Sequence, residues 1–580
     1  MSAGKVRSGN DLSLLLCGEA GRGIQSVESV TTGLLKSAGF HVFSWKEFMS
    51  RVRGGSNSTT IRVASHSVEA PLGRVDLLFP FDAAALRHVR HRVTSDTILF
   101  ADEDIIDTVQ SPDGPVTAVV PFRKTAVELG NAVYANMVAS GFIAGLFDVD
   151  FTLIGARVES LFTGPRAGLA AVNHEAARQG YDLARKIVDD GLFRSTIIPD
   201  SVVHDRAFIS GAEAVGIGAL AGGCNFVSSY PMSPSTAVLV FMAEKAREFE
   251  CVVEQAEDEI SAVNMAIGAW YAGARAMVTT SGGGFALMEE AMGLAGMIES
   301  PLVIHLAQRP GPATGLPTRT EQGDLQLALY SGHGEFPRIL LAPATAREAI
   351  ELSRRAFHMA DRYQVPVFIL TDQYLIDSYY TAIPPEIDGS PPISNIVETE
   401  RDYRRYRLTP DGVSPRGIPG WGAGLVMVDS DEHDEEGHIT ENHQVRTAMV
   451  DKRMAKYAAM ERDVLQPSLV GSEEYHTLVV SWGSTGPVVR EALERLGRPG
   501  VSQLHFSQVF PLHVNTAHYL EKARRIILVE GNATSQFGRL LRAETGYRAT
   551  DRILKYDGLP FTVEELERRL AALDGGEVEP

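Results

Sequence analysis

Cysteine is scarce in this chain of 580 residues, which contains only Cys17, Cys224 and Cys251. Four cysteine thiolates are the usual ligands of an iron–sulfur cluster, so we do not expect this chain to hold a cluster by itself. The three cysteines lie in apolar, strand-like segments and show no paired spacing. Such a context is typical of buried core residues.

Long apolar runs are lacking as well. No segment of 18 or more apolar residues occurs, and the polar start of the chain contains basic residues but no apolar signal core. We therefore expect no membrane association and a cytoplasmic location. The formal net charge of -19 argues against nucleic acid as a partner, although local basic patches can still bind small phosphorylated ligands.

The length exceeds what a single hydrophobic core usually supports, so several domains are expected. Strand-like and helix-like segments alternate through most of the chain, which predicts an α/β fold with several doubly wound domains. The helices expected are near 24–37, 83–91, 125–138 and 168–190 in the first domain, and from residue 208 at the start of the central domain. The alternation is interrupted by a stretch rich in proline and polar residues, which predicts an extended connector that leads into a charged helix near 446–462. We expect domains at 1–195, 206–381 and 475–580, with the connector at 382–474.

The segment 228–236 reads SSYPMSPST and follows an apolar strand at 224–227. Proline fixes its own φ and disfavours a helical residue before it, so Tyr230 and Ser233 should be extended and a helix should begin beyond Pro234. Hydroxyls and backbone amides are thereby placed at the carboxyl end of a strand. Open α/β sheets bind their ligands at that end.

Two further segments carry polar groups to strand ends. Residues 252–262 (VVEQAEDEISA) bring acidic residues to the start of a helix, with Glu259 leading a face rich in alanine and glycine. For Glu254, Glu257 and Asp258, ordinary helix N-terminal charge is the simpler interpretation. A strand at 275–280 then leads into the turn 281–284 (SGGG), after which a helix is expected from residue 285. The glycines of this turn allow close backbone approach to a ligand.

The last of these segments follows a strand at 301–307 and reads QRPGPATGLPTRTEQGD over residues 308–324. Arg309 lies at the strand end, where proline and glycine restrain the chain. An arginine held in this way is suited to bidentate binding of a carboxylate.

Taken together, YPMSPS, EDEISA, TSGGG and QRPGPATGLPTRTEQGDL resemble the α subunit of the 2-oxoacid:ferredoxin oxidoreductases, most closely the 2-oxoglutarate type with a fused γ domain. The resemblance implies that 206–381 is the pyrimidine-binding domain of a thiamine diphosphate enzyme. It also implies that 1–195 is the γ-type domain and that 475–580 resembles the C-terminal domain of transketolase.

The resemblance assigns roles to individual residues. Glu259 matches the glutamate that hydrogen-bonds the aminopyrimidine ring and drives ylid formation, and Tyr230 and Pro231 lie on the cofactor side of the same site. Ser233 takes the position of a Thr or Ser near the bound 2-oxoacid, and Arg309 that of the arginine that pairs with the substrate carboxylate. The commoner Ile-Thr is replaced by Met-Ser at 232–233, which keeps the hydroxyl.

Near the N-terminus, a strand runs into the turn GRG at 21–23, but the spacing is not the GxGxxG of dinucleotide-binding folds. Residues 46–57 then add basic side chains beside a Gly-Gly turn, which suits a phosphate or pyrophosphate; an exposed basic turn is the alternative. In the family, these segments lie toward the coenzyme A site. The coenzyme A candidates are therefore Gly21, Gly23, Lys46, Arg51 and Arg53.

No Gly-Asp-Gly motif for a diphosphate and Mg²⁺ occurs in the chain. The resemblance therefore implies a β partner that carries the diphosphate, Mg²⁺ and an iron–sulfur cluster, with ferredoxin as electron acceptor and a dimer of αβ heterodimers as the assembly. A 2-oxoglutarate substrate needs a second cation for its distal carboxylate, and Arg319 is the candidate. An apolar distal pocket would instead indicate pyruvate or a branched-chain 2-oxoacid. A non-catalytic acyl-CoA-binding scaffold is a further alternative, against which the retention of Glu259 and Arg309 argues.

Two segments near the C-terminal half allow more than one interpretation. The acidic loop at 428–440, which contains Asp431 and His438, does not match the spacing of a calcium-binding loop, and a solvated or interface loop is the favoured interpretation over a metal site. An acidic cluster that contains histidines is also suited to sense pH, which is a further alternative. Residues 529–538 (VEGNATSQFG) predict turn chemistry that serves packing between domains.

Overall fold

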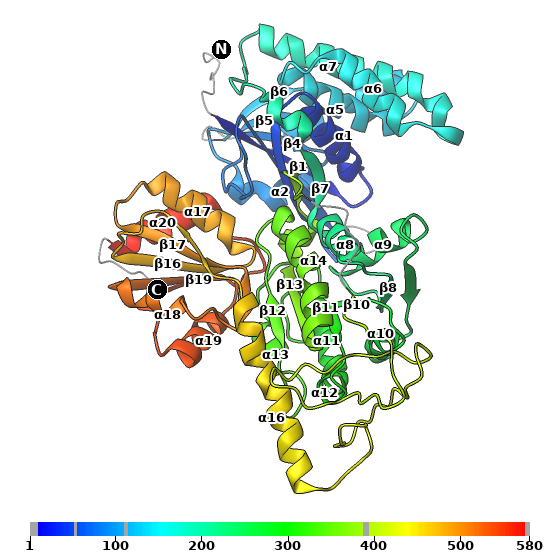
Figure 1. The fold of residues 1–580 in the computed structure, drawn as a ribbon. Coiled ribbons are helices and arrows are strands. Elements are labelled where there is room, and N and C mark those ends of the chain that lie inside the picture. Colours follow the sequence, from blue (N-terminus) through cyan, green and yellow to red (C-terminus); the bar gives the residue numbers. More distant parts are fainter. Residues whose placement is uncertain (1–9, 51–54, 109–113, 387–393, 575–580) are drawn as a thin grey trace. The chain divides into compact units, whose positions relative to one another are not determined.

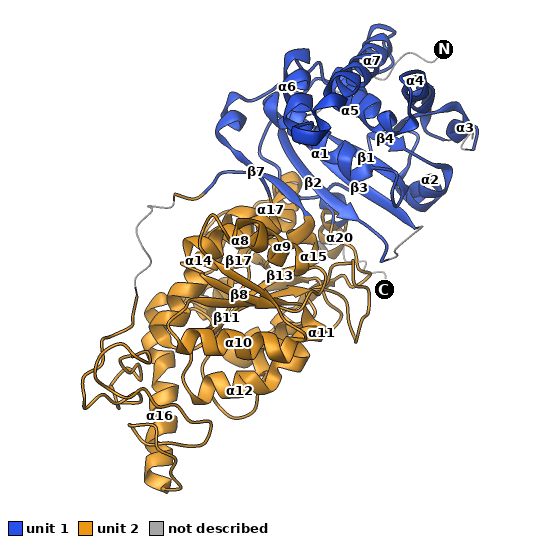
Figure 2. Cartoon of the chain, turned by 90° about the vertical axis from the view of Figure 1, so that its right-hand side faces the viewer, with its two compact units in different colours: residues 1–209, 378–384, 562–565 blue, residues 210–377, 385–561, 566–580 orange. Residues whose placement is uncertain are grey.

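A computed structural model describes residues 10–50, 55–108, 114–386 and 394–574. The chain forms two compact units, which Figure 2 shows in blue and orange. In both, parallel strands alternate with helices, so the predicted α/β class is confirmed. The first unit consists of residues 1–209, 378–384 and 562–565, and the second of residues 210–377, 385–561 and 566–580.

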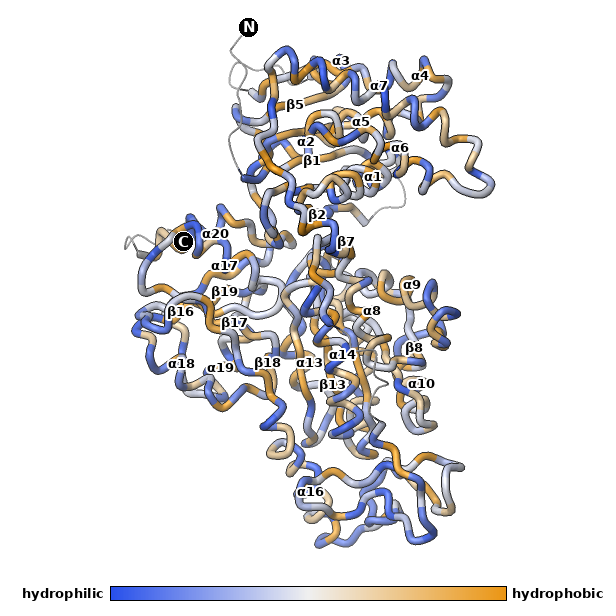
Figure 3. Tube along the Cα trace, turned by 45° about the horizontal axis from the view of Figure 1, so that its top comes forward, coloured by the Kyte–Doolittle hydropathy of each residue, from blue (hydrophilic) through white to orange (hydrophobic). Residues whose placement is uncertain are grey.

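The first unit is built on a mixed sheet with the strand order β6-β5-β4-β1-β3-β2-β14-β7, of which Figure 1 labels β6, β5, β4, β1 and β7. Neighbours from β6 to β1 are parallel, whereas β3 pairs antiparallel with both β1 and β2. Hydrophobic residues run along β1 and β5 (orange in Figure 3), as expected for strands that are covered on both faces. The strands are β1 Asp11–Glu19, β2 His41–Glu47, β3 Ser56–Ala64, β4 Leu77–Pro80, β5 Ile98–Ala101, β6 Val116–Val119, β7 Ala207–Ser210 and β14 Tyr379–Ala382.

Helices form near 24–37, 83–91 and 168–190, as the sequence predicts, whereas the helices at 103–106 and 151–161 were not predicted. The single helix expected near 125–138 is wrong, because the chain forms two helices there. Gly130 adopts a left-handed φ of 107°, and the side chain of Asn131 accepts a hydrogen bond from the amide of Val133, which starts a new turn. The helices are α1 Ile24–Ser37, α2 Ala83–Val89, α3 Glu103–Ile106, α4 Phe122–Glu128, α5 Ala135–Leu146, α6 Phe151–Leu161 and α7 Ala170–Asp189.

The second unit contains a sheet with the order β18-β12-β13-β11-β10-β8-β9, in which β18 alone pairs antiparallel. Since the other strands are parallel, their carboxyl ends lie along one edge. Ligands of open α/β sheets bind at this edge. The strands are β8 Phe226–Ser229, β9 Val252–Gln255, β10 Ala276–Thr280, β11 Leu302–Gln308, β12 Ile339–Leu341, β13 Pro366–Asp372 and β18 Gln508–Phe510.

Side-chain caps set the start of three of the helices around this sheet, at residues 211, 259 and 346. The helix expected from residue 208 begins only at Gly211, because residues 207–210 form β7 and Ser210 caps the helix in a capping box with Glu213. A helix begins beyond Pro234, as predicted. The helices are α8 Gly211–Ala221, α9 Thr236–Lys245, α10 Glu259–Tyr271, α11 Gly282–Phe285, α12 Glu289–Met297, α13 Leu325–Tyr330, α14 Ala346–Tyr363 and α15 Gln373–Asp377.

A third sheet, with the order β15-β17-β16-β19-β20, follows in the C-terminal part of the chain. The strands β17, β16, β19 and β20 are parallel to one another, and β15 is antiparallel to β17. The strands are β15 Ser468–Val470, β16 Thr477–Trp482, β17 Val501–Phe506, β19 Arg525–Glu530 and β20 Asp551–Leu554, and the helices are α17 Thr485–Leu496, α18 Thr516–Lys522, α19 Gln536–Thr545 and α20 Val563–Asp574.

Between the two sheets of the second unit, residues 394–442 run without a helix, and α16 (His443–Met460) follows. The helix expected at 446–462 is thus shifted slightly toward the N-terminus. This part of the chain is anchored by buried charge. Nζ of Lys452 lies 2.6 Å and Nζ of Lys456 lies 2.7 Å from the carboxylate of Glu299, and Arg405 donates to the carbonyl oxygen of Glu299 at 2.7 Å.

Candidate active site

Glu259 is the first residue of α10 and follows β9 at the carboxyl edge of the parallel sheet. The preceding Asp258 caps the helix, because its side chain accepts a hydrogen bond from the amide of Ser261 at 2.7 Å. Glu259 therefore does not serve as the cap, and its side chain is only 3% exposed. Its Oε1 atom is shielded from solvent and has no hydrogen-bond partner among the described residues. A buried acceptor without a hydrogen bond destabilises the folded protein unless a ligand supplies a donor.

Two carboxylates lie against the glycine turn at residues 282–284. A Cβ atom at Gly284 would come within 2.6 Å of Oε1 of Glu259, and one at Gly282 within 2.4 Å of the carboxylate of Asp324. Only glycine leaves room for both side chains. The glycines also form α11 themselves, whereas a turn that ends before residue 285 was expected. The glycines are therefore needed to make room for the side chains of Glu259 and Asp324, in addition to any ligand.

Asp324 is a candidate site residue that the sequence did not predict. Its amide donates to Oε1 of Gln308 at 3.0 Å, which fixes the backbone beside the end of β11. Its Oδ2 atom is shielded and has no partner among the described residues. Burial raises the pKa of Asp324 to about 7; the nearby Glu321 also raises it, and Arg309 lowers it. An acid at the end of a long polar loop after a strand was the signal in the sequence.

Arg309 and Ser233, both predicted to bind substrate, are neighbours. Nη1 of Arg309 donates a hydrogen bond to the carbonyl oxygen of Ser233 at 2.7 Å. Nε of Arg309 is shielded and unpartnered within the described part of the chain. Tyr230, at the end of β8, is 39% exposed, and Pro231 is partly buried.

Four shielded polar atoms thus gather around the glycine turn. The hydroxyl of Ser281, which directly precedes the turn, is also buried and has no partner among the described residues. The set comprises one guanidinium nitrogen, one hydroxyl and two carboxyl oxygens, from Arg309, Ser281, Glu259 and Asp324. Unsatisfied buried groups are rare in folded proteins, so their concentration at one strand edge indicates a ligand site.

Arg319 lies further along the loop of residues 309–324. It packs beside Gly558, where a Cβ would meet its side chain at 3.1 Å, and the amide of the next residue, Thr320, donates to the carbonyl oxygen of Gly558 at 3.1 Å. The structure thus places Arg319 next to the loop that follows β20.

The same loop is fixed by Gln322, which the sequence analysis also missed. The amide of Gln322 donates to the carbonyl oxygen of Gly531 at 2.6 Å, its Oε1 accepts from the amide of Gly531 at 2.9 Å, and its Nε2 donates to the carbonyl oxygen of Trp482 at 2.8 Å. Asn532 donates to the carbonyl oxygen of Gln322. The loop that bears Arg309 and Asp324 is therefore held by the third sheet.

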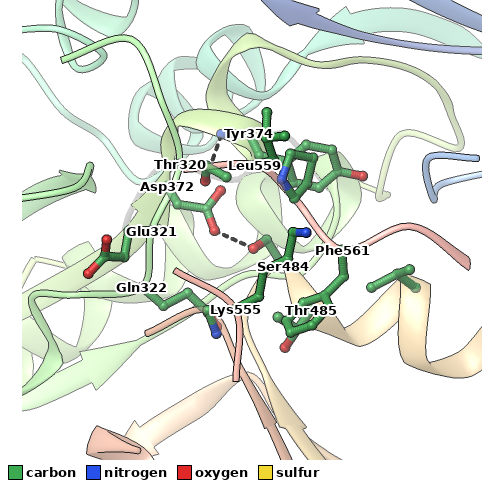
Figure 4. A pocket seen from close by; sticks show the side chains of 13 residues that line it. Thr320, Glu321, Gln322, Asp372, Tyr374, Ser484, Thr485, Lys555, Leu559 and Phe561 are labelled. Carbon is green, nitrogen blue, oxygen red and sulfur yellow. Dashed lines mark hydrogen bonds between the residues drawn. The ribbon is translucent and has the colours of Figure 1, made fainter. Parts of the chain in front are cut away.

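A small pocket lies beside this anchored loop, and Figure 4 shows its lining. Thr320, Glu321 and Gln322 contribute to the lining, and Ser484 donates a hydrogen bond to the buried carboxylate of Asp372, which lies beside Thr320 and Glu321. The cavity measures about 30 Å³, which accommodates a water molecule but no organic substrate. It belongs to the anchorage of the loop.

The first unit contains a larger cavity of about 330 Å³. Gly21, Gly23 and Lys46 line it, so the structure brings together three of the coenzyme A candidates. The cavity adjoins the N-terminus of α1, where backbone amides favour an anion. Nζ of Lys46 lies 3.2 Å from Oε2 of Glu28. Arg51 and Arg53 lie outside the described residues.

The conformation of the acidic loop at 428–440 is explained by hydrogen bonds within the loop itself. Asp434, Glu436 and His438 hold ligand atoms within 4.8 Å of one another, but Asp434 accepts hydrogen bonds from the amides of Glu436 and His438 at 2.9 and 3.0 Å, which accounts for the turn. The ring of the buried His433 stacks on Tyr406, with 3.8 Å between the ring centres, and anchors the loop.

Other expectations from the sequence can be compared directly with the structure. Cys17, Cys224 and Cys251 are buried and unpaired, as expected for core residues. Among the helices that the structure describes, none is long and apolar enough to cross a membrane.

Two family models match this chain. The model described as "Pyruvate flavodoxin/ferredoxin oxidoreductase, thiamine diP-bdg" covers residues 217–452, and "Pyruvate ferredoxin/flavodoxin oxidoreductase" covers residues 13–183. The first match contains the cluster around the glycine turn, and the second contains the cavity at α1. The second unit therefore includes a domain of the thiamine diphosphate-binding class.

Individual relatives define the family of this chain more narrowly than the two family models do. The 2-oxoacid:ferredoxin oxidoreductase subunit alpha of Sulfolobus sp is 31% identical, over 96% of this chain and 96% of its own length. The 2-oxoglutarate synthase subunit KorA of Archaeoglobus fulgidus is 34% identical, over 57% of this chain and 89% of its own length. A solved 2-oxoglutarate:ferredoxin oxidoreductase from Magnetococcus marinus, with 2-oxoglutarate, coenzyme A and succinyl-CoA bound, superposes with a TM-score of 0.91 at 30% identity, over 97% of this chain and 99% of that chain.

The chain belongs to the family of 2-oxoacid:ferredoxin oxidoreductase α subunits. The resemblance inferred from the sequence motifs is confirmed, and with it the assignment as a subunit of an oxidoreductase.

Proposed function

We propose that this chain is the α subunit of a 2-oxoglutarate:ferredoxin oxidoreductase. The reaction joins 2-oxoglutarate and coenzyme A with two oxidised ferredoxins and yields succinyl-CoA, CO₂, a proton and two reduced ferredoxins, and it is reversible. The cluster of unpartnered polar atoms around residues 282–284 is the observation that supports the reaction class. The substrates named for the Magnetococcus marinus structure and for the KorA relatives support 2-oxoglutarate.

The residues present fit the pyrimidine half of thiamine diphosphate. Oε1 of Glu259 is buried and unpartnered, and the glycine turn leaves space beside it. Glu259 would accept a hydrogen bond from the aminopyrimidine ring and hold its proton. When bound, thiamine diphosphate supplies the carbon nucleophile and the electron sink for decarboxylation. Tyr230 and Pro231, at the end of β8, would contact the cofactor from the neighbouring strand.

The substrate contacts follow from the arrangement of Arg309 and Ser233. Arg309 is fixed through Nη1 by the carbonyl oxygen of Ser233, which leaves Nε to donate to a carboxylate. The hydroxyl of Ser233 is exposed at the same edge. Arg319 is proposed as the cation for the distal carboxylate, which would select 2-oxoglutarate over pyruvate or a branched-chain 2-oxoacid.

A β partner would complete the enzyme. This chain has no Gly-Asp-Gly motif, and its three cysteines are dispersed, so the diphosphate, Mg²⁺ and the iron–sulfur cluster are assigned to the β subunit. We further propose a dimer of αβ heterodimers, a cytoplasmic location and ferredoxin as electron acceptor. The division into domains at 1–195, 206–381 and 475–580, with a linker at 382–474, is part of the same proposal.

Coenzyme A is proposed to bind at the cavity of the first unit. Gly21 and Gly23 line this cavity beside the N-terminus of α1, where backbone amides favour an anion, and Lys46 adds positive charge to the lining. Arg51 and Arg53 are proposed to contribute further cationic contacts to the phosphates.

The test is anaerobic co-purification with the β subunit, followed by coenzyme A-dependent viologen reduction with thiamine diphosphate, Mg²⁺ and, in parallel, 2-oxoglutarate, pyruvate and 2-oxoisovalerate. We expect a preference for 2-oxoglutarate and a loss of about 10²–10⁴-fold in kcat for Glu259→Gln. The exposed Glu257→Gln is the matched control and should be neutral. Preference for pyruvate would refute the role of Arg319, and coenzyme A binding without any turnover would indicate a scaffold.

A further inference from the structure

Arg309 and Asp324 lie near each other without forming an ion pair. The amide of Asp324 donates to the side chain of Gln308, the residue directly before Arg309, at 3.0 Å, and the positive charge of Arg309 lowers the pKa of Asp324. Yet Nε of Arg309 and Oδ2 of Asp324 are both shielded from solvent, and neither atom has a partner among the described residues. In a buried site, opposite charges normally make direct contact. These two atoms are instead available to a third group.

The third group is restricted by the chemistry of its two neighbours. Nε–H of Arg309 can only donate a hydrogen bond, so the group must carry an acceptor. A carboxylate is the acceptor that arginine binds best, but a second carboxylate beside it would repel it unless one of the two carried a proton. A protonated Asp324 would satisfy this condition, since it would donate from its O–H.

We propose that Asp324 binds the substrate in its protonated form and donates a hydrogen bond to the carboxylate that Arg309 holds. The 2-oxoacid is then taken up together with a proton whenever Asp324 is ionised in the free enzyme. This inference rests on the proposed function and adds a substrate-binding residue to the same site.

The surroundings of Asp324 support this protonation. Burial brings its pKa to about 7, so that both forms are populated near neutral pH. Among the charged groups around Asp324, Glu321 on the same loop raises its pKa and so favours the protonated form. Arg309 at the end of β11 lowers the pKa and favours the ionised form. The carboxylate of Glu259 lies across the glycine turn. An arriving anion adds negative charge and raises the pKa further.

Asp324 is also held in place. Its amide is bound by Gln308, and the preceding carbonyl oxygen of Gly323 accepts a hydrogen bond from Nε2 of Gln536 at 2.7 Å. With both polar groups of the peptide bond between Gly323 and Asp324 hydrogen-bonded, the carboxyl group is held against Gly282, and it can meet a substrate without rearrangement of the loop.

The experiment is calorimetric titration of the αβ holoenzyme with N-oxalylglycine, an analogue of 2-oxoglutarate without its ketone, in buffers of different ionisation enthalpy. Above pH 7 we expect the affinity of the wild type to fall about tenfold per pH unit and each bound ligand to take up nearly one proton. Asp324→Asn keeps a neutral donor and should bind with no proton uptake and no pH dependence. Glu321→Gln is the control, and proton uptake should persist in it.

The outcomes separate this inference from the proposed function. Proton uptake that is unchanged in Asp324→Asn would overturn the inference, and so would a wild type that takes up no proton at pH 8, whether or not the variant folds. Failure of the wild-type complex to oxidise any 2-oxoacid would instead refute the proposed function. For turnover, kcat/KM for 2-oxoglutarate should decline above pH 7 in the wild type and stay level in Asp324→Asn.

Discussion

Asn532 donates a hydrogen bond from Nδ2 to the carbonyl oxygen of Gln322 at 3.0 Å, although 210 residues separate the two. The side chain of Asn532 is oriented by Glu530, whose Oε1 accepts from the same Nδ2 at 3.0 Å and from Nε1 of Trp482 at 3.1 Å. All of these side chains are buried. The third sheet thereby fixes the backbone two residues before Asp324, so the C-terminal segment contributes to the geometry of the site.

Removal of this contact should affect substrate binding. Asn532→Ala leaves a buried carbonyl oxygen and a buried carboxylate with fewer donors, so we expect a loss of about 1–3 kcal/mol in stability. Because the loop of residues 309–324 is then less restrained, kcat/KM for the 2-oxoacid should fall by about tenfold. Thermal unfolding and steady-state kinetics of the αβ complex measure the two effects. In Asn515→Ala, the control, an exposed side chain that makes no cap hydrogen bond is removed, and both quantities should stay unchanged. A destabilised complex with normal kcat/KM would show that the contact is only structural.

The glycine turn allows a second prediction with an internal control. Gly284→Ala places a methyl group 2.6 Å from Oε1 of Glu259 and 2.3 Å from Oγ1 of Thr280. Glu259 must then move, and we expect activity to fall by at least about a hundredfold if its position is essential. Gly268→Ala in α10 has no atom within 4 Å of the new methyl group and should stabilise the helix by about 0.5–1 kcal/mol without loss of activity. Full activity of Gly284→Ala would refute the assigned role of Glu259.

The sequence predicted those parts of the site that are defined by local structure. Arg309 directly follows β11, and Ser233 and Glu259 lie in the short segments that follow β8 and β9, whose ends are revealed by apolar runs, prolines and glycines. The environments of Asp324 and Gln322 are created by contacts with distant segments: Gly282 in one case, and Trp482, Gly531 and Asn532 in the other. The polar loop after β11 marks Asp324 as a candidate, but no local pattern records these contacts.

The same distinction applies to the fold. The α/β class follows from the alternation of apolar strands with helices, and most strand positions agree. The break between α4 and α5 was missed because it depends on the left-handed conformation of Gly130 and on the side-chain cap of Asn131, whereas the surrounding residues favour a continuous helix. In the connector, proline and polar residues suggested a solvated chain, but Arg405 and the lysines of α16 find buried partners on Glu299.

A third prediction concerns this buried cluster. Glu299 lies between Lys452 and Lys456, whose cationic charges hold its pKa well below the usual range, while burial lowers the pKa of Lys456 to about 8. Glu299→Gln would leave two buried ammonium groups without a counterion, so we expect a loss of about 3–5 kcal/mol in stability. Chemical unfolding of the complex measures the loss.

The pH dependence of this loss has a defined sign. Folding depresses the pKa of such a lysine, so the folded state favours its neutral form. The free-energy cost of burying the lysine therefore falls as the pH rises above its pKa in the folded state. The loss in free energy of unfolding that Glu299→Gln causes should therefore be smaller at pH 9 than at pH 6. Glu351→Gln, which removes an exposed partner of Arg347, is the control and should change stability by less than about 0.5 kcal/mol. An equally small effect of Glu299→Gln would show that the lysines find other partners.

The fourth prediction uses the stability of the protein to test the pKa of Asp324 without any ligand. Folding raises this pKa from its usual value near 3.8 to about 7, so the folded state binds the proton more strongly than the unfolded state. The stability that the protonated carboxyl contributes is present below pH 4 and is lost as the pH rises toward 7. An asparagine does not titrate. The Tm of Asp324→Asn relative to the wild type should therefore increase between pH 4 and 7 and remain level above pH 7, whereas Glu257→Gln should show no such trend. A difference that does not vary with pH would mean that Asp324 is ionised throughout, and the proton-coupled binding of the 2-oxoacid would fail with it.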